Sequence, residues 1–391
     1  MTDMTPAPPV RAVTLCLPDE VFQDGRVDVG GVGEYGGKVL EIGEEITRAG
    51  FDVQTVRLSS PALDEPVNHE QLSTRAADLV EGCRRAGVGS ASLSALRPAA
   101  LVELEPAGIA EVLTEHPSLF LSVVVADGSD VDVSAVDFSA AVIRELASRD
   151  GDANFRFAAI ANLGAGAPLF PGSFSDGGPA GVSVGLQSAG TLLAHARADR
   201  PRDLAETTRL TRRCLQAQLD VFEGLLRPSC ERRDLLFNGF DPSPACAPDA
   251  SIGEFLEHVG GIRFGAHGML ATCAAVTAGV RSVSQPTVGY GGLMLPVLED
   301  RVLARAWQEG RINADSVLAY SSVCGAGLDT IPLPGSTPEH EVVAMIRDMA
   351  ALSARWVKPL SARLMLAPVG SDPRRTEFRA EQIVNIDYPS V

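Results

Sequence analysis

The sequence predicts an α/β protein with a mainly parallel sheet in one large domain. From residue 11 onward, segments rich in β-branched residues alternate with amphipathic segments at least five times, the pattern of repeated β–α–β units. The alternation continues without a low-complexity linker or a charge block, which favours one domain over two. Apolar residues make up 45% of the 391 residues, enough for a large core. An unbroken series of this length can also close into an α/β barrel.

The first half of the chain opens with a strand and a helix. Residues 11–17 alternate and are rich in Val, Thr and Leu, as expected of a strand. Apolar residues at helical spacing, with acidic residues between them, predict a helix over 34–49. The same reasoning predicts strands at 51–58, 89–93, 119–125 and 155–160. It also predicts helices at 71–86 and 135–148, and a helix after the 89–93 strand that ends at 114.

The second half of the chain continues the alternation. A strand is expected at 181–186 and a long helix from about 203 to 226. After a proline-rich loop at 241–248, Ser251 and Glu254 have the spacing of a capping box at the start of a helix. Further helices are predicted at 268–278, 302–307 and 338–355, and a last strand at 362–366.

Charge and composition exclude several classes of protein. The formal net charge of −17 opposes binding to nucleic acid and to anionic membranes, because both surfaces carry negative charge. Residues 1–9 resemble a disordered tail and not a signal peptide, and the longest apolar run, 119–126, is too short to cross a bilayer. The seven cysteines are scattered without a CxxC pair, so neither a disulfide framework nor a zinc site is expected. These features predict a soluble, cytoplasmic protein.

The segment from Gly31 to Gly36 matches the GxGxxG pattern of dinucleotide-binding folds. In those folds the first glycine directly follows the first strand, whereas here a dozen or so residues intervene. The second strand ends in Arg57, where an acid that binds ribose would be expected. NAD or NADP binding is therefore not expected. The segment is better interpreted as a glycine-rich start of a helix, which can hold an anion at its N-terminus.

Two polar residues precede an apolar run near the middle of the chain. Asn154 and Arg156 would share one face of the predicted strand, and an arginine among apolar residues must be paired or solvated. Arg156 could thus clamp a carboxylate or phosphate of a substrate, or form a structural ion pair with Glu299 or Asp300. Asn238 and Asp241 lie in the loop before the 252 helix, where Asp241 either faces a cleft or completes a polar turn.

Two glycine-rich turns between residues 286 and 335 carry the remaining candidate residues. Glycine permits backbone geometries that aim side chains into a cleft. The first turn presents Tyr290 and then Glu299 and Asp300, which either favour the start of the next helix or, if buried together, act as a general acid or base. The second presents Cys324 and Asp329.

The role of Cys324 depends on its neighbours in the fold. A thiolate nucleophile needs a base or a positive charge nearby, and His267 and Arg156 can supply one only through folding. The alternative is a buried, inert cysteine. Asp329 could orient a base or a substrate, or bond to its own turn. His267 could be an acid/base or a helix cap.

Four segments together resemble a known family: Asn-Phe-Arg-Phe at 154–157, Pro-Leu-Phe-Pro at 168–171, Gly-Tyr-Gly-Gly-Leu-Met-Leu-Pro-Val-Leu-Glu-Asp at 289–300 and Val-Cys-Gly-Ala-Gly-Leu-Asp-Thr-Ile-Pro-Leu-Pro-Gly at 323–335. The family is the bacterial and archaeal one catalogued as domain of unknown function 711, and the resemblance covers roughly residues 10–385. It implies a homodimer and a large single-domain α/β barrel related in fold to pyruvate formate-lyase and other glycyl-radical enzymes. The Arg-Val-small-Gly-aromatic radical motif is absent from 370–391, so radical chemistry is not expected.

Two functions of different classes remain open. The first is an enzyme that acts on a small polar or anionic metabolite by non-redox lyase, isomerase or hydrolase chemistry. Asn154 and Arg156 would then bind the substrate, Glu299, Asp300 or Asp329 would move protons, and Mg²⁺ or Ca²⁺ on the same carboxylates could assist. The second is a non-catalytic protein that binds and senses a metabolite.

Overall fold

The computed structural model describes residues 9–389, except for residues 24, 248, 249 and 369. The predicted tail, residues 1–9, lies outside the described residues except for Pro9. The carbonyl of Pro9 accepts a hydrogen bond from the backbone N–H of Gln187 at 3.2 Å. In the described part of the chain, no helix is both long enough and apolar enough to span a bilayer.

The core is a ten-stranded mixed sheet in the order β10-β9-β1-β4-β5-β6-β8-β12-β11, with β7 paired to β6. A central block of five strands is parallel, and the two flanking pairs run the other way because β9 is antiparallel to β1 and β12 is antiparallel to β8. The strands are β1 (Val10–Cys16), β4 (Val56–Ser59), β5 (Ser90–Leu96), β6 (Leu119–Asp127), β7 (Asp130–Val131), β8 (Phe157–Ala161), β9 (Gly181–Leu186), β10 (Leu236–Asp241), β11 (Gly327–Leu333) and β12 (Leu360–Leu366), and β2 (Phe22–Gln23) and β3 (Arg26–Val27) form a separate ribbon.

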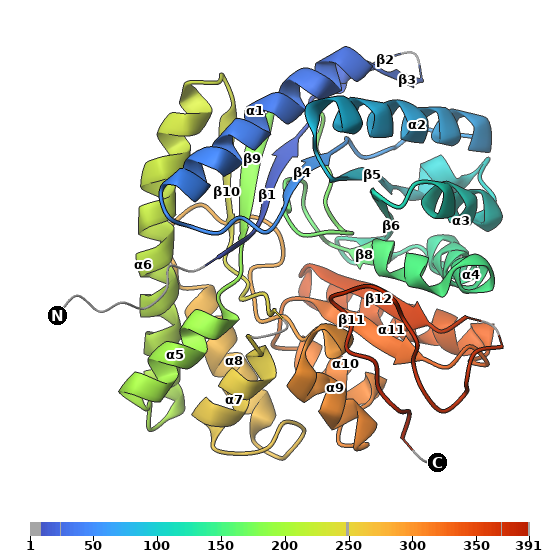
Figure 1. Ribbon diagram of the computed structural model, residues 1–391. Helices are drawn as coiled ribbons and strands as arrows, with labels where there is room; N and C mark the ends of the chain where they lie inside the picture. The colour runs from blue at the N-terminus through green and yellow to red at the C-terminus, as the bar shows by residue number, and fades with distance from the viewer. Residues whose placement is uncertain (1–8, 24, 248–249, 369, 390–391) are drawn as a thin grey trace.

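Helices surround the curved sheet (Figure 1). Following contacts between neighbours, α6, α1, α2, α3, α4, α11, α10 and α8 form a ring that returns to α6. The helices are α1 (Val29–Arg48), α2 (His69–Ala86), α3 (Pro106–Glu115), α4 (Val133–Arg149), α5 (Ala189–Asp199), α6 (Leu204–Glu231), α7 (Ile252–Gly260), α8 (Met269–Val280), α9 (Arg301–Gln308), α10 (Ala314–Ser321) and α11 (Glu339–Trp356), and the 3-10 turns are η1 (Asp19–Val21), η2 (Pro98–Leu101), η3 (Gly151–Arg156) and η4 (Val297–Glu299).

The predicted closed barrel is not formed by strand pairing within the described residues. The path of hydrogen-bonded strands ends at β10 and β11, and no ladder joins these two. The fold is therefore an α/β protein with a large, mostly parallel mixed sheet inside a closed ring of helices.

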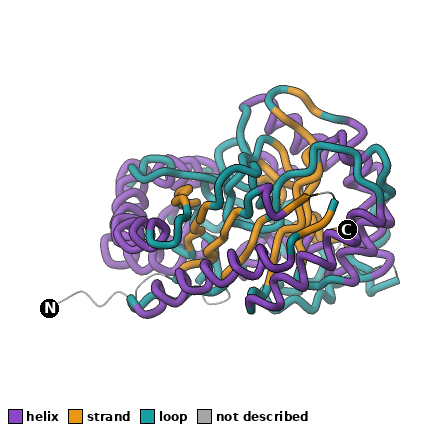
Figure 2. The backbone as a smooth tube through the Cα atoms, turned by 90° about the horizontal axis from the view of Figure 1, so that it is seen from above, coloured by secondary structure: helices purple, strands orange, loops and turns teal. Residues whose placement is uncertain are grey.

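The loop between β8 and β9, residues 162–180, packs on the face of the sheet away from the helices. Thr14 Oγ1 donates to the carbonyl of Pro168 at 2.9 Å, and Ser92 Oγ donates to the carbonyl of Ser173 at 2.6 Å. Ala95, Val124, Ala158 and Ile160 form a second, smaller core with this loop. Loops crossing the strands are visible in Figure 2. Two cavities remain, one on each side of this loop.

Several elements differ from the sequence prediction. Residues 151–156 form η3 and not the start of a strand, so Asn154 and Arg156 do not share a strand face. The predicted turn at 320–335 is the end of α10 followed by β11, and the segment before the 252 helix includes strand β10. Strands with Gly, Pro or Asn, such as Leu236-Phe-Asn-Gly-Phe-Asp241 at the edge of the sheet, lack the alternating pattern on which strand prediction depends.

Candidate functional site

The candidate site is a cavity of about 500 Å³ at the end of the sheet where β1, β4 and β5 begin and where β10 has ended. Because β10 and β11 run against the central block, the carboxyl ends of those two strands lie at the same end of the sheet as the amino ends of the central strands. Its charged and polar lining comprises Arg11, Gln54, Thr55, Arg57, Ser90, Arg156, Cys246, Glu299, Asp329, Arg363, Glu381 and Gln382. We call it the arginine cavity.

A buried ionic network forms one wall of the arginine cavity. Arg363 contacts both Glu299 and Asp329, and its Nε lies 2.8 Å from Asp329 Oδ1. Arg11 Nη2 donates to the other oxygen of Glu299 at 3.1 Å. These groups are almost fully buried, and Glu299, Asp329 and Arg363 are each no more than 7% exposed. Burying a charge costs free energy unless the charge is paired, and each of these charges is paired.

Two irregularities in the strands position this network. In β1, Arg11 is the extra residue of a register shift against β9. In β11, Leu328 pairs with Ala362 and Ile331 with Leu364, so Asp329 and Thr330 together lie opposite Arg363. Thr330 has φ 46°, a left-handed conformation that a β-branched residue rarely adopts. β-Bulges and strained backbone are frequent next to functional sites, where they re-aim a side chain.

The pKa values of the network follow from burial and pairing. Burial raises the pKa of Asp329; the charge of Arg363 opposes the rise and that of Glu299 adds to it. Burial lowers the pKa of Arg363, but Asp329 and Glu299 outweigh it and the net change is upward. Asp329 is thus a buried carboxyl group that lines a cavity and has a raised pKa.

Arg57 differs from the arginines of the network because it has no acidic partner in the described part of the chain. Its Nε donates to Thr55 Oγ1 at 2.8 Å, and its guanidinium lies 4.7 Å from the centroid of the Phe170 ring. Burial and the nearby charges of Arg11 and Arg363 lower the pKa of Arg57 to about 9, although the charge of Glu299 opposes this change. Arg57 is therefore charged at neutral pH, and no acidic side chain of the described residues forms an ion pair with it.

Another part of the lining of the arginine cavity is apolar and largely aromatic. The rings of Phe120 and Phe170 pack with centroids 4.9 Å apart, and Phe155 lies 4.6 Å from the guanidinium of Arg363. Leu169 and Met294 complete this wall. The cavity therefore combines a charged wall with a surface that can bury a hydrocarbon group.

The three strand arginines of this site were missed by the sequence prediction. Arg57 was considered only as an argument against a ribose site, and Arg11 and Arg363 were not singled out. Each is a lone arginine in a short β-branched or apolar strand. An arginine among apolar residues must be paired or solvated. This pattern, interpreted above only for Arg156, also marks these three arginines.

Glu299 and Asp300 do not act as a pair, which corrects the prediction of two carboxylates at one site. Glu299 joins the arginine cavity, whereas Asp300 is the N-cap of α9. Asp300 accepts from the N–H of Val302 at 2.9 Å and from Ser251 Oγ at 2.8 Å, and so links the starts of α9 and α7. It is 1% exposed and has a structural role.

Asp241 also holds the backbone instead of facing a cavity. Its carboxylate accepts from the N–H groups of Ser243, Tyr290 and Gly291 at 3.0, 2.9 and 3.3 Å, and burial raises its pKa. Gly289 has φ 77°, and a Cβ there would overlap this carboxylate. Asp241 thus fixes the first glycine-rich turn.

Replacing Asp241 by asparagine is expected to lower the free energy of unfolding by about 1–3 kcal/mol. In the wild type both carboxylate oxygens of Asp241 accept hydrogen bonds from backbone N–H groups. In the variant one of these oxygens becomes an NH₂ donor, which cannot accept a hydrogen bond from an N–H group. Urea unfolding measures this change. Ligand affinity in the arginine cavity should stay within about twofold, because Asp241 does not line it. A loss of binding with unchanged stability would contradict the structural role.

Cys324 is buried and lies next to Cys273 on α8, outside the arginine cavity. His267 is exposed at the start of α8 and lines neither of the two cavities beside the 162–180 loop. The two residues are not brought together with Asp329 or Glu299, so the predicted assistance by a thiol or imidazole has no geometric support. The cation near Cys324 is Lys358, whose Nζ donates to the carbonyls of Ser321 (2.6 Å) and Cys324.

Lys358 gives a testable pH dependence. Burial, and to a smaller extent Arg281, lower its pKa from the ordinary 10.5 to about 8. Between about pH 8 and 10.5 the side chain of Lys358 holds more protons in the unfolded chain than in the folded protein. The free energy of unfolding should therefore rise with pH, and Lys358 should contribute roughly 3 kcal/mol to this rise. Urea unfolding at several pH values should show this rise in the wild type and lose it in Lys358→Met. Equal slopes in both proteins would contradict the assignment.

The remaining predicted residues lie beside the arginine cavity or away from it. Arg156 lines the cavity, and its Nη1 donates to the carbonyls of Leu113, His116 and Leu119 and so fixes the end of α3. Neither alternative ion pair, with Glu299 or Asp300, is formed. The Nδ2 of Asn154 donates to the carbonyl of Leu366 at 3.2 Å.

Tyr290 is buried, and Asn238 is half-buried near the start of β10. Tyr290 is 5% exposed in the smaller core, where burial raises its pKa. Asn238 packs on Gly181 in the neighbouring strand β9, where a Cβ would overlap it. Neither lines the arginine cavity.

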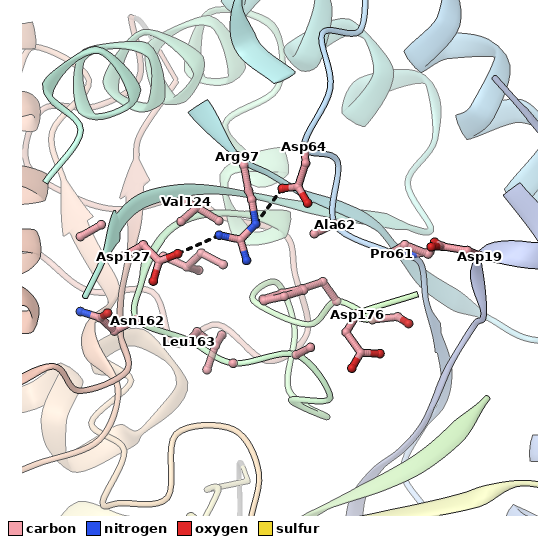
Figure 3. Close-up of a pocket in the computed structure, with 16 residues that line it drawn as sticks. Asp19, Pro61, Ala62, Asp64, Arg97, Val124, Asp127, Asn162, Leu163 and Asp176 are labelled. Carbon is pink, nitrogen blue, oxygen red and sulfur yellow. Dashed lines mark hydrogen bonds and ion pairs between the residues drawn. The ribbon is translucent and has the colours of Figure 1, made fainter. Parts of the chain in front are cut away.

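A second cavity of about 390 Å³ lies on the other side of the 162–180 loop, at the carboxyl ends of β4, β5, β6 and β8. Figure 3 shows Arg97 between Asp64 and Asp127, to which it is bonded at 2.8 and 3.0 Å. Asp19 and Asp176 also line this cavity. These four acids are exposed, so none is forced to find a ligand in place of water.

The structure also bears on metal and dinucleotide binding. Within the described ranges, no three His, Cys, Asp or Glu side chains gather as metal ligands do, and Glu299 and Asp329 are engaged by arginines. The residues from Gly31 to Gly36 lie inside α1, which begins at Val29 with Asp28 as its cap. Their glycines therefore do not form a phosphate-binding turn, and Gly36 packs closely against Ala86 of α2.

The fold and the site define the class: an α/β protein with a large mixed sheet and a charged cavity at one end of its strands. The chain belongs to the family described as Uncharacterised ACR (DUF711), whose model matches residues 9–378. This confirms the family resemblance found in the sequence.

Curated relatives carry the name UPF0210 protein. UPF0210 protein MK1214 of Methanopyrus kandleri is 28% identical over 93% of this chain and 87% of its own length. The UPF0210 protein of Pyrobaculum arsenaticum is 30% identical over 69% of this chain and 61% of its own length, and UPF0210 protein SMU_73 of Streptococcus mutans is 29% identical over 64% and 58%. The chain thus matches about three fifths of the length of the last two. These names state no activity.

Proposed function

We propose that the chain is an enzyme that binds a small anionic metabolite in the arginine cavity and transforms it by non-redox acid/base chemistry. The observation that carries the proposal is the unpaired guanidinium of Arg57, which lines a cavity together with the buried carboxyl group of Asp329. A cation without a counter-ion in a sheltered cavity is stabilised when an anion binds next to it.

The roles of the side chains follow from their contacts. Arg57 would bind the anionic group of the substrate, and Asp329 would accept or donate a proton. Arg363, Glu299 and Arg11 would hold Asp329 in place, because Arg363 bridges the two carboxylates. An anchored anion and a carboxyl group that transfers protons can support lyase, isomerase or hydrolase chemistry.

Two further expectations belong to this proposal. A fold relation to pyruvate formate-lyase is supported by the closed ring of helices and by the loop that crosses the interior of the sheet. The homodimer is implied by the family resemblance.

The experiment that tests the proposal has two stages. Thermal-shift and calorimetric measurements with a panel of small carboxylates and phosphates identify anions that bind. NMR then follows each binding anion for turnover by the wild type, by Asp329→Asn and by the matched control Asp348→Asn, an exposed residue of α11.

We expect turnover to fall by about 10²–10⁴-fold in Asp329→Asn, with little change in affinity for the anion. The control Asp348→Asn should keep the turnover and the affinity of the wild type. Binding of an anion without turnover by the wild type would favour the alternative, a metabolite sensor. Unchanged turnover in Asp329→Asn would contradict the role of Asp329.

A further inference from the structure

We infer that the ligand of the arginine cavity is an amphipathic monocarboxylate: a single carboxylate attached to an aromatic or bulky aliphatic group. This rests on the proposed function and names its substrate class. The charge of the lining, the free edge of Arg57 and the apolar wall each contribute to it.

The charge of the lining favours a single negative charge. Four arginines and three acidic residues line the cavity, which leaves one positive charge in excess. Arg11 and Arg363 are neutralised by Glu299 and Asp329, and the only arginine of the network region without an acidic or carbonyl partner in the described residues is Arg57. A monoanion neutralises Arg57, whereas a dianion such as a phosphate monoester leaves a negative charge beside Glu299 and Asp329.

The geometry of Arg57 favours a planar carboxylate. Its Nε donates to Thr55 Oγ1, and its central carbon lies over the ring of Phe170, 4.7 Å from the ring centroid. The edge formed by its two terminal nitrogens has no partner in the described part of the chain. Two parallel N–H donors match the two oxygens of a carboxylate.

The apolar wall requires a hydrocarbon group on the ligand. Phe120 and Phe170 form a tilted pair next to Arg57, and both are accessible from the cavity. A ligand that carried only charge would leave these rings facing water. A cavity of about 500 Å³ is large enough for an aromatic ring in addition to the carboxylate.

The test compares the binding of four probes to the full chain by calorimetry or ligand-observed NMR. The probes separate the effect of a negative charge on the ligand from the effect of an apolar ring. Phenylacetate has both the charge and the ring, acetate lacks the ring, 2-phenylacetamide lacks the charge, and inorganic phosphate carries more charge without a ring. We expect phenylacetate to bind at least about tenfold more tightly than each of the other three.

Two variants locate the binding. Arg57→Gln should weaken phenylacetate by about tenfold or more without changing 2-phenylacetamide. Phe120→Ala should weaken phenylacetate and leave acetate unchanged. Phenylacetate binding that neither variant alters would overturn the inference.

The outcomes also separate this inference from the proposed function. If phosphate binds more tightly than phenylacetate and depends on Arg57, the monocarboxylate class is wrong, while the anion site stands. If no anion binds in an Arg57-dependent way, both proposals fail.

Discussion

Replacing Arg57 by glutamine is expected to weaken anion binding in the arginine cavity by about 10- to 100-fold. Hydrogen bonds to a charged group contribute about 1.5–3 kcal/mol, and the unpaired guanidinium is the feature that makes this cavity attractive to an anion. Glutamine retains a donor and much of the side-chain length but removes the charge. Isothermal titration calorimetry with the best anion from the panel measures the change.

The same variant should not be less stable than the wild type in the absence of ligand. Because the folded pKa of Arg57, about 9, is below the ordinary 12.5, the charged group opposes folding at all pH values below about 9. Removing the charge removes that cost. Loss of binding combined with equal or higher stability is a signature that a merely structural arginine would not give.

The matched control is Arg347→Gln on α11. Arg347 is 51% exposed and makes only a 3.5 Å contact with Asp137, so its loss changes the net charge of the chain by the same amount. Equal weakening of binding in both variants would show a general electrostatic effect and would contradict a specific role of Arg57.

The largest stability effect is expected for Arg363→Gln, about 3–5 kcal/mol. Arg363 bridges Glu299 and Asp329, and its removal leaves two buried carboxylates with only Arg11 to compensate them. Urea unfolding measures the loss. The stability of Arg363→Gln should recover in part as the pH falls, because protonation of the two carboxyl groups then relieves the uncompensated charge.

A second substitution tests whether charge imbalance is the cause. Adding Asp329→Asn to Arg363→Gln should restore part of the stability, because one unpaired carboxylate is removed. Additive losses in the double variant would contradict a coupled network and would indicate that packing of Arg363 on Phe155 dominates.

Most strands and helices could be predicted from sequence because local pattern determines them. The strand at 181–186 is confirmed residue for residue, and α2, α7, α8 and α11 begin within two or three residues of the predicted positions. Local sequence pattern could not show whether the sheet closes into a barrel. Closure depends on pairing between strands distant in the chain, and β10 and β11 do not pair.

The site was predicted only in part because side-chain roles depend on residues far apart in sequence. Glu299 and Asp329 were identified, and both line the arginine cavity. Their partner Arg363 and the unpaired Arg57 are separated from them by tens to hundreds of residues, and the bulge that turns Asp329 toward Arg363 leaves no local signature. Two other predicted site residues, Asp241 and Asp300, instead accept hydrogen bonds from backbone N–H groups.

The most direct test of the account is to locate a bound anion in crystals. Crystals soaked in 4-bromophenylacetate allow the bromine to be located by its anomalous scattering. The account predicts a peak in the arginine cavity near Phe120, with the carboxylate on Arg57, and no peak in crystals of Arg57→Gln. A peak in the cavity around Arg97 instead, or equal peaks in both crystals, would contradict it.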